Sequence, residues 1–363
     1  MKEPLPFIEQ KDGKLILNEE VLTKIKEATN PKFISFYGTT RFGKSTTLNQ
    51  IIVGNKESWT YYREKPFKTG NDIISVTSGC NIYGPVKFSE LKERHPKLGS
   101  SNLINGDFDI FFCDTEGIGS LDRFSKASIP GILTILQICT LSVYMIKEKC
   151  IDQDVKEICS LMQLSKILSN DLKLHPRVCV YVAQMLCGNE IDNIDFETLN
   201  ENDIRNAYIE HYENSINTTE DNILKDANKR FPDLDFKKDD LKIIAGGPYV
   251  KTAHPVKDIN LVFYWYSIHE IFNIFTNIYY KEQKAKKKEE KEGTNFNIDI
   301  VSLIRQLFEI FSKIDKLDDD FNLRTFLINY LEEEFKKQTE EQFSLLLEKI
   351  KEEIKINFKE YVD

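Results

Sequence analysis

The sequence predicts an α/β fold, in which a mostly parallel β-sheet is flanked by helices and followed by an all-helical C-terminal region. Three observations favour this fold. Short apolar runs typical of buried strands alternate with helical segments over roughly the first 280 residues. One of these runs leads directly into a glycine-rich loop and a helix. Toward the C-terminus, apolar residues recur at helical spacing.

Strands are predicted from short runs rich in β-branched and aromatic residues. They span residues 33–37, 110–113, 141–144, 178–183 and 241–245. Segments with a helical pattern lie between them. This alternation indicates a mostly parallel sheet covered by helices.

A run of charged residues marks the predicted domain boundary. Residues 280–293 read YKEQKAKKKEEKEG, a solvated segment that ends in glycine. Beyond it, an amphipathic helical pattern begins near Ile300. We therefore expect a large domain over residues 1–282, a charged linker over residues 283–296 and a helical domain over residues 297–363.

Composition limits the class of partner. The net charge of −9 argues against a broad basic surface, so we expect no nucleic acid partner. The seven cysteines are dispersed without any C-x-x-C spacing, which favours free thiols in a reducing compartment. The first residues lack the apolar core of a secretory signal, so a cytoplasmic location is expected.

Two apolar stretches, residues 129–146 and 261–280, need a comparison with transmembrane helices. Gln137 interrupts the first, and His269 and Glu270 lie within the second. Polar groups at the centre of a bilayer cost several kcal/mol, so both stretches are predicted to be buried elements of a folded domain. We expect no transmembrane anchor and no lipid anchor, whereas peripheral contact with a membrane stays open.

The glycine-rich loop carries the first chemical signal. Residues 38–45, GTTRFGKS, match the pattern G-x-x-x-x-G-K-[ST] of a phosphate-binding P-loop, with an apolar strand before it and a helix after it. Lys44 is expected to bridge the β- and γ-phosphates of a nucleoside triphosphate, and the Ser45 hydroxyl to ligate Mg²⁺. The predicted phosphate contacts are Gly38, Thr39, Thr40, Arg41, Phe42, Gly43, Lys44, Ser45 and Thr46.

Two further stretches fit the same chemistry. Residues 110–117, IFFCDTEG, form an apolar strand that ends in Asp114, a predicted Mg²⁺ ligand, and the Gly117 amide can reach the γ-phosphate. Before this strand, residues 75–79 (SVTSG) lie in a polar stretch where Thr77 can complete the Mg²⁺ shell. By itself, such a polar stretch is more typical of an ordinary turn.

Together these stretches resemble the guanylate-binding protein and atlastin branch of the dynamin superfamily. The shared features are an arginine inside the P-loop (Arg41), a D-T-E-G second switch (114–117) and a Ser-x-Thr first switch (Ser75 with Thr77). The resemblance implies GTP hydrolysis by a nucleotide-dependent homodimer, in which Arg41 stabilises charge on the transferring phosphate, an effect worth about 10³ to 10⁵ in rate. It also implies that Ser75 places the attacking water, Thr77 ligates Mg²⁺ and Glu116 supports the water network.

One departure from the family concerns the base. The family reads guanine with an Arg-Asp pair after a strand, whereas the matching strand here leads into Gln184 and Met185, which carry no carboxylate. By resemblance, the expected substrate is GTP, whose base is guanine. If the Gln184 amide instead forms hydrogen bonds with adenine, the substrate is ATP. Residues 189–192, NEID, outline an alternative base motif. Gly246 and Gly247 lie where the family has its loop over the base and are further candidates for nucleotide contact.

The sequence thus predicts a Mg²⁺-dependent nucleoside triphosphatase that cycles between GTP and GDP, or between ATP and ADP. The alternative is a nucleotide-gated binding module with little or no turnover, which the altered base-reading residues favour. A helical scaffold holding a structural nucleotide is a third interpretation. The sequence leaves open whether hydrolysis ends at the diphosphate or continues to the monophosphate.

Overall fold

A computed structural model describes most of the first 313 residues. The described residues are 1, 3–11, 14–38, 43–53, 66–68, 80–94, 107–115, 129–147, 150–172, 177–183, 201–246, 259–292 and 299–313. The chain forms two compact units, residues 1–319 and residues 320–363. The second unit, with the helices expected there, lies outside the described residues.

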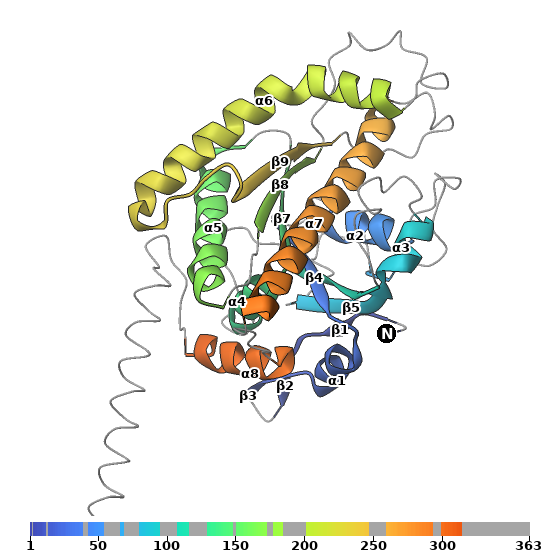
Figure 1. Ribbon diagram of the computed structural model, residues 1–363, viewed down its shortest axis with the longest axis vertical. Coiled ribbons are helices and arrows are strands. Elements are labelled where there is room, and N and C mark those ends of the chain that lie inside the picture. Colours follow the sequence, from blue (N-terminus) through green and yellow to red (C-terminus); the bar gives the residue numbers. More distant parts are fainter. Residues whose placement is uncertain are drawn as a thin grey trace, which may run out of the picture. The chain divides into compact units, whose positions relative to one another are not determined.

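The described part of the first unit is an α/β fold built on a sheet of seven strands, in the order β1-β5-β6-β4-β7-β8-β9 (Figure 1). Adjacent strands from β6 to β9 all run parallel. They are β6 (Asp109–Thr115), β4 (Lys32–Gly38), β7 (Leu141–Lys147), β8 (Arg177–Ala183) and β9 (Leu241–Ala245). Each covers a run predicted from the sequence, so these strand predictions are confirmed.

The sheet is mixed because its other end is antiparallel. Strand β5 (Cys80–Lys87) pairs antiparallel with β6, and the short β1 (Leu5–Pro6) pairs antiparallel with β5. A separate hairpin is formed by β2 (Ile8–Lys11) and β3 (Lys14–Leu17). These antiparallel elements had no counterpart in the sequence prediction.

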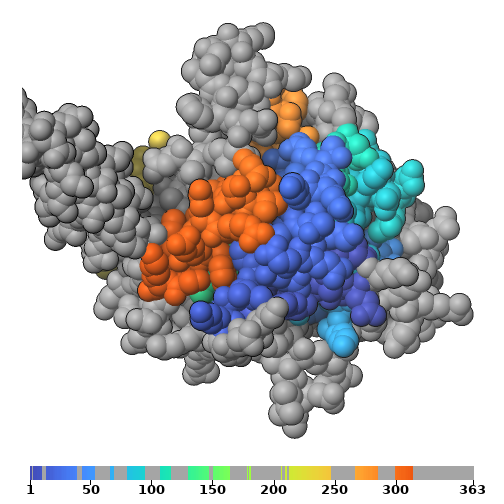
Figure 2. Space-filling view, turned by 90° about the horizontal axis from the view of Figure 1, so that it is seen from below, coloured from blue at the N-terminus to red at the C-terminus, as the bar shows by residue number. Residues whose placement is uncertain are grey.

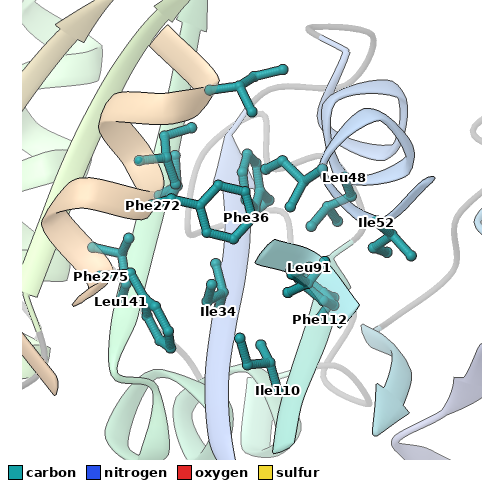
Figure 3. Packing of buried hydrophobic residues seen from close by; sticks show 14 of the residues in the cluster. Ile34, Phe36, Leu48, Ile52, Leu91, Ile110, Phe112, Leu141, Phe272 and Phe275 are labelled. Atoms are coloured by element: carbon teal, nitrogen blue, oxygen red, sulfur yellow. The ribbon is translucent and has the colours of Figure 1, made fainter. Parts of the chain in front are cut away.

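One face of the sheet is covered by α2 (Lys44–Val53), α3 (Phe88–Arg94) and α7 (Ile259–Glu292). Figure 3 shows Ile34 and Phe36 of β4 between Leu48 of α2 on one side and Phe272 of α7 on the other. Alternate side chains of a strand point to opposite faces, so these even-numbered residues of β4 form a continuous apolar core with both helices.

The opposite face carries α4 (Ile129–Ile138) and α5 (Asp152–Leu172). Helix α4 lies against β4 on one side and against α8 (Ile300–Phe311) on the other. Because it is enclosed in this way, α4 is mostly apolar, and its two polar residues, Thr134 and Gln137, are buried as well. Helix α6 (Glu201–Arg230) contacts α5, α7 and β9, and a 3-10 turn (Pro232–Leu234) follows it.

Helix α8 also packs against α1 (Glu19–Glu27), which begins at an Asn18 cap. In Figure 2, α8 in orange lies side by side with the N-terminal residues in blue. Both guanidinium nitrogens of Arg305 donate to the Glu19 carboxylate, at 3.0 and 2.7 Å. The apolar stripe of α8 is buried, and its members are Val301, Leu303, Ile304, Leu307, Phe308 and Phe311.

The charged segment expected as a linker over residues 283–296 has a defined structure in part. Residues 283–292 continue α7 without a break, up to Glu292. Helix α8, expected in a separate helical domain over residues 297–363, belongs to the first compact unit. The limits of the two compact units therefore differ from the domain limits expected from the charge pattern.

Both apolar stretches compared with membrane spans are elements of this fold. The first becomes α4 and β7, and the second lies within α7, where Ile271, Phe272 and Phe275 are fully buried. Among the helices described, none is long and apolar enough to cross a membrane. Five cysteines are free thiols, namely Cys80, Cys113, Cys139, Cys150 and Cys159.

Candidate functional site

The candidate site lies at the edge of the sheet where the parallel strands end. From β4 the chain passes to β5 and β6 on one side of β4, and then crosses to β7 on the other side. The direction of the connections therefore reverses at β4. In open α/β sheets, ligands bind beyond the carboxyl ends of the strands at such a reversal.

Gly38 is the last residue of β4 and begins the predicted loop. Its φ is +120°, and a Cβ atom built on it would lie 2.2 Å from the Met145 carbonyl oxygen of β7. A side chain at this position would therefore collide with the backbone of the neighbouring strand. Glycine is required here both by its backbone conformation and by the close approach of β7.

The other end of the loop leads into α2. Gly43 has φ +85°, and its carbonyl accepts a hydrogen bond from the Thr47 amide at 2.7 Å, which starts the helix. Thr46 is half-buried in the first turn. The first amide groups of a helix have no partner within the helix, so its N-terminal end favours an anion.

Lys44 lies in the first turn of α2 and is 7% exposed. Its Nζ donates to the carbonyl oxygen of Gly38, the last residue of β4, at 2.9 Å. Burial lowers the pKa of Lys44 to about 8, whereas the negative charge of Asp114 acts in the opposite direction. The site therefore holds an ammonium group whose charge the protein stabilises incompletely.

Ser45 and Asp114 form a direct contact between α2 and β6. The Ser45 hydroxyl donates to Asp114 Oδ2 at 2.6 Å, and Asp114 is 1% exposed. Asp114 pairs with Phe36 in the sheet, and the next residue, Thr115, donates its hydroxyl to the Phe36 carbonyl oxygen at 2.9 Å. The sheet thus fixes the carboxylate beside the first turn of α2.

This pair of oxygens suits a hard cation. Mg²⁺ prefers hydroxyl, carboxylate and phosphate oxygens, and it is usually held by one or two protein groups together with the substrate. Clusters of three or more carboxylate, imidazole or thiol groups able to hold a metal ion do not occur within the described ranges. The hydroxyl oxygen of Ser45 and the carboxylate oxygens of Asp114 are of the kind that Mg²⁺ prefers.

The structure brings Gly38, Gly43, Lys44, Ser45 and Asp114 together at one corner of the sheet. Gly246 is buried directly after β9, at the same edge of the sheet but separated from β4 by β7 and β8. The remaining predicted site residues lie outside the described ranges: Thr39, Thr40, Arg41, Phe42, Ser75, Thr77, Glu116, Gly117, Gln184, Met185 and Gly247.

Sequence reasoning missed two residues that support this corner. Thr115 lies inside the D-T-E-G motif, but its role in joining β6 to β4 depends on strand pairing. Asn49 holds the backbone of Phe67 through its side chain amide. No sequence signal set Asn49 apart, because Thr46, Thr47 and Gln50 of the same helix are polar too.

Comparison of the sequence with family models and with curated proteins found no match.

Proposed function

We propose that this protein is a Mg²⁺-dependent nucleoside triphosphatase with a P-loop at residues 38–45. The observation that carries the proposal is the corner formed by Lys44, Ser45 and Asp114 at the carboxyl end of β4. A lysine and a hydroxyl at the start of a helix, beside a strand-end carboxylate, are the groups that P-loop enzymes use to hold phosphate and Mg²⁺.

The state of Lys44 supports a phosphate ligand. Its ammonium group is buried and its pKa is lowered to about 8. An arriving polyphosphate would supply negative charge next to this cation, and the Lys44 ammonium would then exchange its hydrogen bond to the Gly38 carbonyl oxygen for one to a phosphate oxygen. Lys44 can therefore recognise the ligand by charge, while the helix amides orient it.

Ser45 and Asp114 would hold Mg²⁺, which neutralises charge on the β- and γ-phosphate oxygens when it is bound. Asp114 is held in place by its sheet pairing and by the Ser45 hydroxyl. Rigid positioning of this kind is the main protein contribution to phosphoryl transfer, because little covalent chemistry is left for the side chains.

The remaining roles follow the resemblance to guanylate-binding proteins and atlastins. Arg41 would stabilise the transferring phosphate when two copies of the chain meet, and Ser75 and Glu116 would place the attacking water. Thr77 would complete the Mg²⁺ shell. Guanine is the base expected by resemblance, and the Gln184 amide makes adenine the competing choice.

The test is phosphate release from GTP and from ATP, with Mg²⁺, across a range of protein concentrations. Turnover per molecule that rises with concentration supports activation by dimerisation. Arg41→Ala is expected to lower kcat by about 10³-fold or more while nucleotide still binds. Ser45→Ala serves as the control that removes the hydroxyl expected to ligate Mg²⁺.

Each outcome separates the candidate functions. Strict GTP turnover would reject the adenine interpretation of Gln184, and strict ATP turnover would reject guanine. Tight nucleotide binding without turnover would identify a nucleotide-gated module instead. An absence of binding by either nucleotide would refute the proposal as a whole.

A further inference from the structure

The pairing of β4 with β6 ends at Asp114. Its register runs up to the pair of Phe36 and Asp114, whereas Gly38, two residues further along β4, pairs with Met145 of β7. The carboxylate expected to bind Mg²⁺ and the start of the P-loop therefore lie on two strands at the point where their ladder stops. The separation of these two groups depends on what joins the ends of the two strands.

Thr115, the last residue of β6, makes one more contact with β4 beyond this last pair. Its hydroxyl donates to the Phe36 carbonyl oxygen at 2.9 Å, and its side chain is fully buried. Phe112 of β6 belongs to the core on the α2 side of the sheet (Figure 3). Side chains alternate along a strand, so Asp114 points to that same side and Thr115 to the opposite one. Thr115 can therefore hold β6 to β4 without entering the proposed site.

Packing alone does not require a hydroxyl at residue 115. Valine has nearly the same shape as threonine and also favours strands, whereas burying a hydroxyl costs free energy unless it is hydrogen-bonded. On its other side, Thr115 pairs with Cys80 of β5, so the antiparallel ladder holds it in that direction. The threonine hydroxyl supplies the corresponding hold on the β4 side, where the parallel register has already ended.

We infer that Thr115 is a positioning residue of the proposed nucleotide site, whose bond to Phe36 sets the separation between the Asp114 carboxylate and the P-loop. Bound Mg²⁺ must contact the protein oxygens and the phosphates held by the loop at the same time. It demands near-ideal octahedral geometry, so a small shift of the carboxylate weakens Mg²⁺ binding more than it weakens the phosphate contacts. The inference rests on the proposed function.

The sheet contains a matched control on the same face. The Ser35 hydroxyl of β4 donates to the Ser142 hydroxyl of β7 at 3.3 Å, and both side chains are fully buried. Ser35 pairs with Cys113, two residues before Thr115, so this contact lies one row away from the Thr115 bond. It joins β4 to β7, whereas Asp114 lies on β6 at the other side of β4. Ser142→Ala therefore removes a buried hydroxyl contact of β4 that does not hold the Asp114 strand.

The experiment compares Thr115→Val, Thr115→Ser and Ser142→Ala in the full chain, with GTP and with ATP. It measures nucleotide Kd in EDTA and in Mg²⁺, the Mg²⁺ concentration at half-maximal phosphate release, kcat and urea unfolding. In Thr115→Val, the gain in nucleotide affinity that Mg²⁺ supplies should shrink by about 3- to 10-fold, and kcat should fall by about 10-fold, because small misplacements of reacting groups have effects of that size. Its Kd in EDTA should stay within about twofold of the parental value.

The other variants separate positioning from a general loss of stability. Thr115→Ser keeps the hydroxyl and should behave like the parent. Ser142→Ala should lose stability in urea to an extent similar to Thr115→Val, yet keep the parental Mg²⁺ dependence and kcat. Thr115→Cys, whose thiol is a weak donor, provides a second test and should show a smaller change of the same sign as Thr115→Val.

A parental response to Mg²⁺ in Thr115→Val would overturn the inference, as would an equal change in Ser142→Ala or an equal loss of affinity in EDTA and in Mg²⁺. If the parent binds neither nucleotide, or gains no affinity from Mg²⁺, the proposed site fails and this inference fails with it. A parent that binds nucleotide without turnover still tests the inference through the gain in affinity. A parent that responds to Mg²⁺ alongside unaffected Thr115 variants overturns the inference alone.

Discussion

Replacing Lys44 by methionine is expected to stabilise the nucleotide-free protein while removing its affinity for nucleotide. Methionine keeps a long unbranched stem but carries no charge. In the structure, the Lys44 ammonium is buried beside the end of β4, with the Gly38 carbonyl oxygen at 2.9 Å and the Asp114 charge nearby. These groups compensate only part of what the ammonium loses on leaving water, because its pKa is lowered.

The magnitude follows from the change in pKa. Burial lowers the pKa of Lys44 from 10.5 to about 8. At roughly 1.4 kcal/mol for each pH unit, the charged form therefore lowers the free energy of unfolding by about 3 kcal/mol near neutral pH. Loss of the hydrogen bond to Gly38 offsets about 1 kcal/mol of this, and loss of the other interactions of Lys44 offsets more. We expect Lys44→Met to unfold with a free energy higher than that of the parent by up to about 2 kcal/mol.

The pH dependence has a definite sign. Between about pH 8 and pH 10.5 the unfolded chain holds more protons on Lys44 than the folded protein does, so the parent gains stability as pH rises through this window. Below this window the cost of the buried charge is present in full. The advantage of Lys44→Met should therefore be largest near pH 7 and shrink toward pH 10.5.

The assay is urea unfolding of both proteins without nucleotide, near pH 7 and near pH 10, followed by thermal unfolding with Mg²⁺ and saturating GTP or ATP. Nucleotide should raise the Tm of the parent and leave that of Lys44→Met unchanged, because a ligand stabilises only a protein that binds it. A variant less stable than the parent near pH 7 would refute the reasoning. An advantage that does not change with pH would refute it too.

Two further predictions concern the fold that supports the site. In urea unfolding, Gly38→Ala should lower the free energy of unfolding by more than Gly43→Ala does. A Cβ atom at residue 38 would lie 2.2 Å from the Met145 carbonyl oxygen, whereas a Cβ atom at residue 43 would meet no atom within 4 Å. Equal losses of stability in the two variants would contradict this prediction. A chain ending after residue 319 should unfold cooperatively, whereas one ending after residue 292 should aggregate. The shorter chain lacks α8, whose six buried apolar side chains each contribute about 1.5 to 3 kcal/mol to the free energy of unfolding. Equal solubility of the two chains would contradict this role of α8.

Local patterns were sufficient to predict the parallel strands, including β4, and the helix α2 that begins at Lys44. A strand buried on both faces reads as a continuous apolar run, as in residues 33–37, whatever its neighbours are. The spacing of glycine and lysine likewise predicts a tight backbone turn and a group that can bind phosphate, and this prediction needs no information about distant residues. Gly38, Gly43, Lys44 and Ser45 lie close together for this reason.

The charge pattern was a poor guide to where the fold ends. Residues 280–293 are solvated, but solvation does not prevent a helix, and α7 continues through them to Glu292. The apolar stripe that starts near Ile300 was correctly predicted as helical, yet its partner was not evident from the sequence. Only the packed structure shows that it covers α4 and α1.

The sequence by itself determined which groups this protein offers at the end of β4, because glycine, lysine and serine at that spacing act through local conformation and charge. The tertiary structure alone decided that Asp114 meets Ser45 at 2.6 Å, that Asn49 holds Phe67, and that α8 encloses α4. These contacts join residues far apart in the chain. They depend on strand register and on the packing of helices against the sheet, which no local pattern specifies.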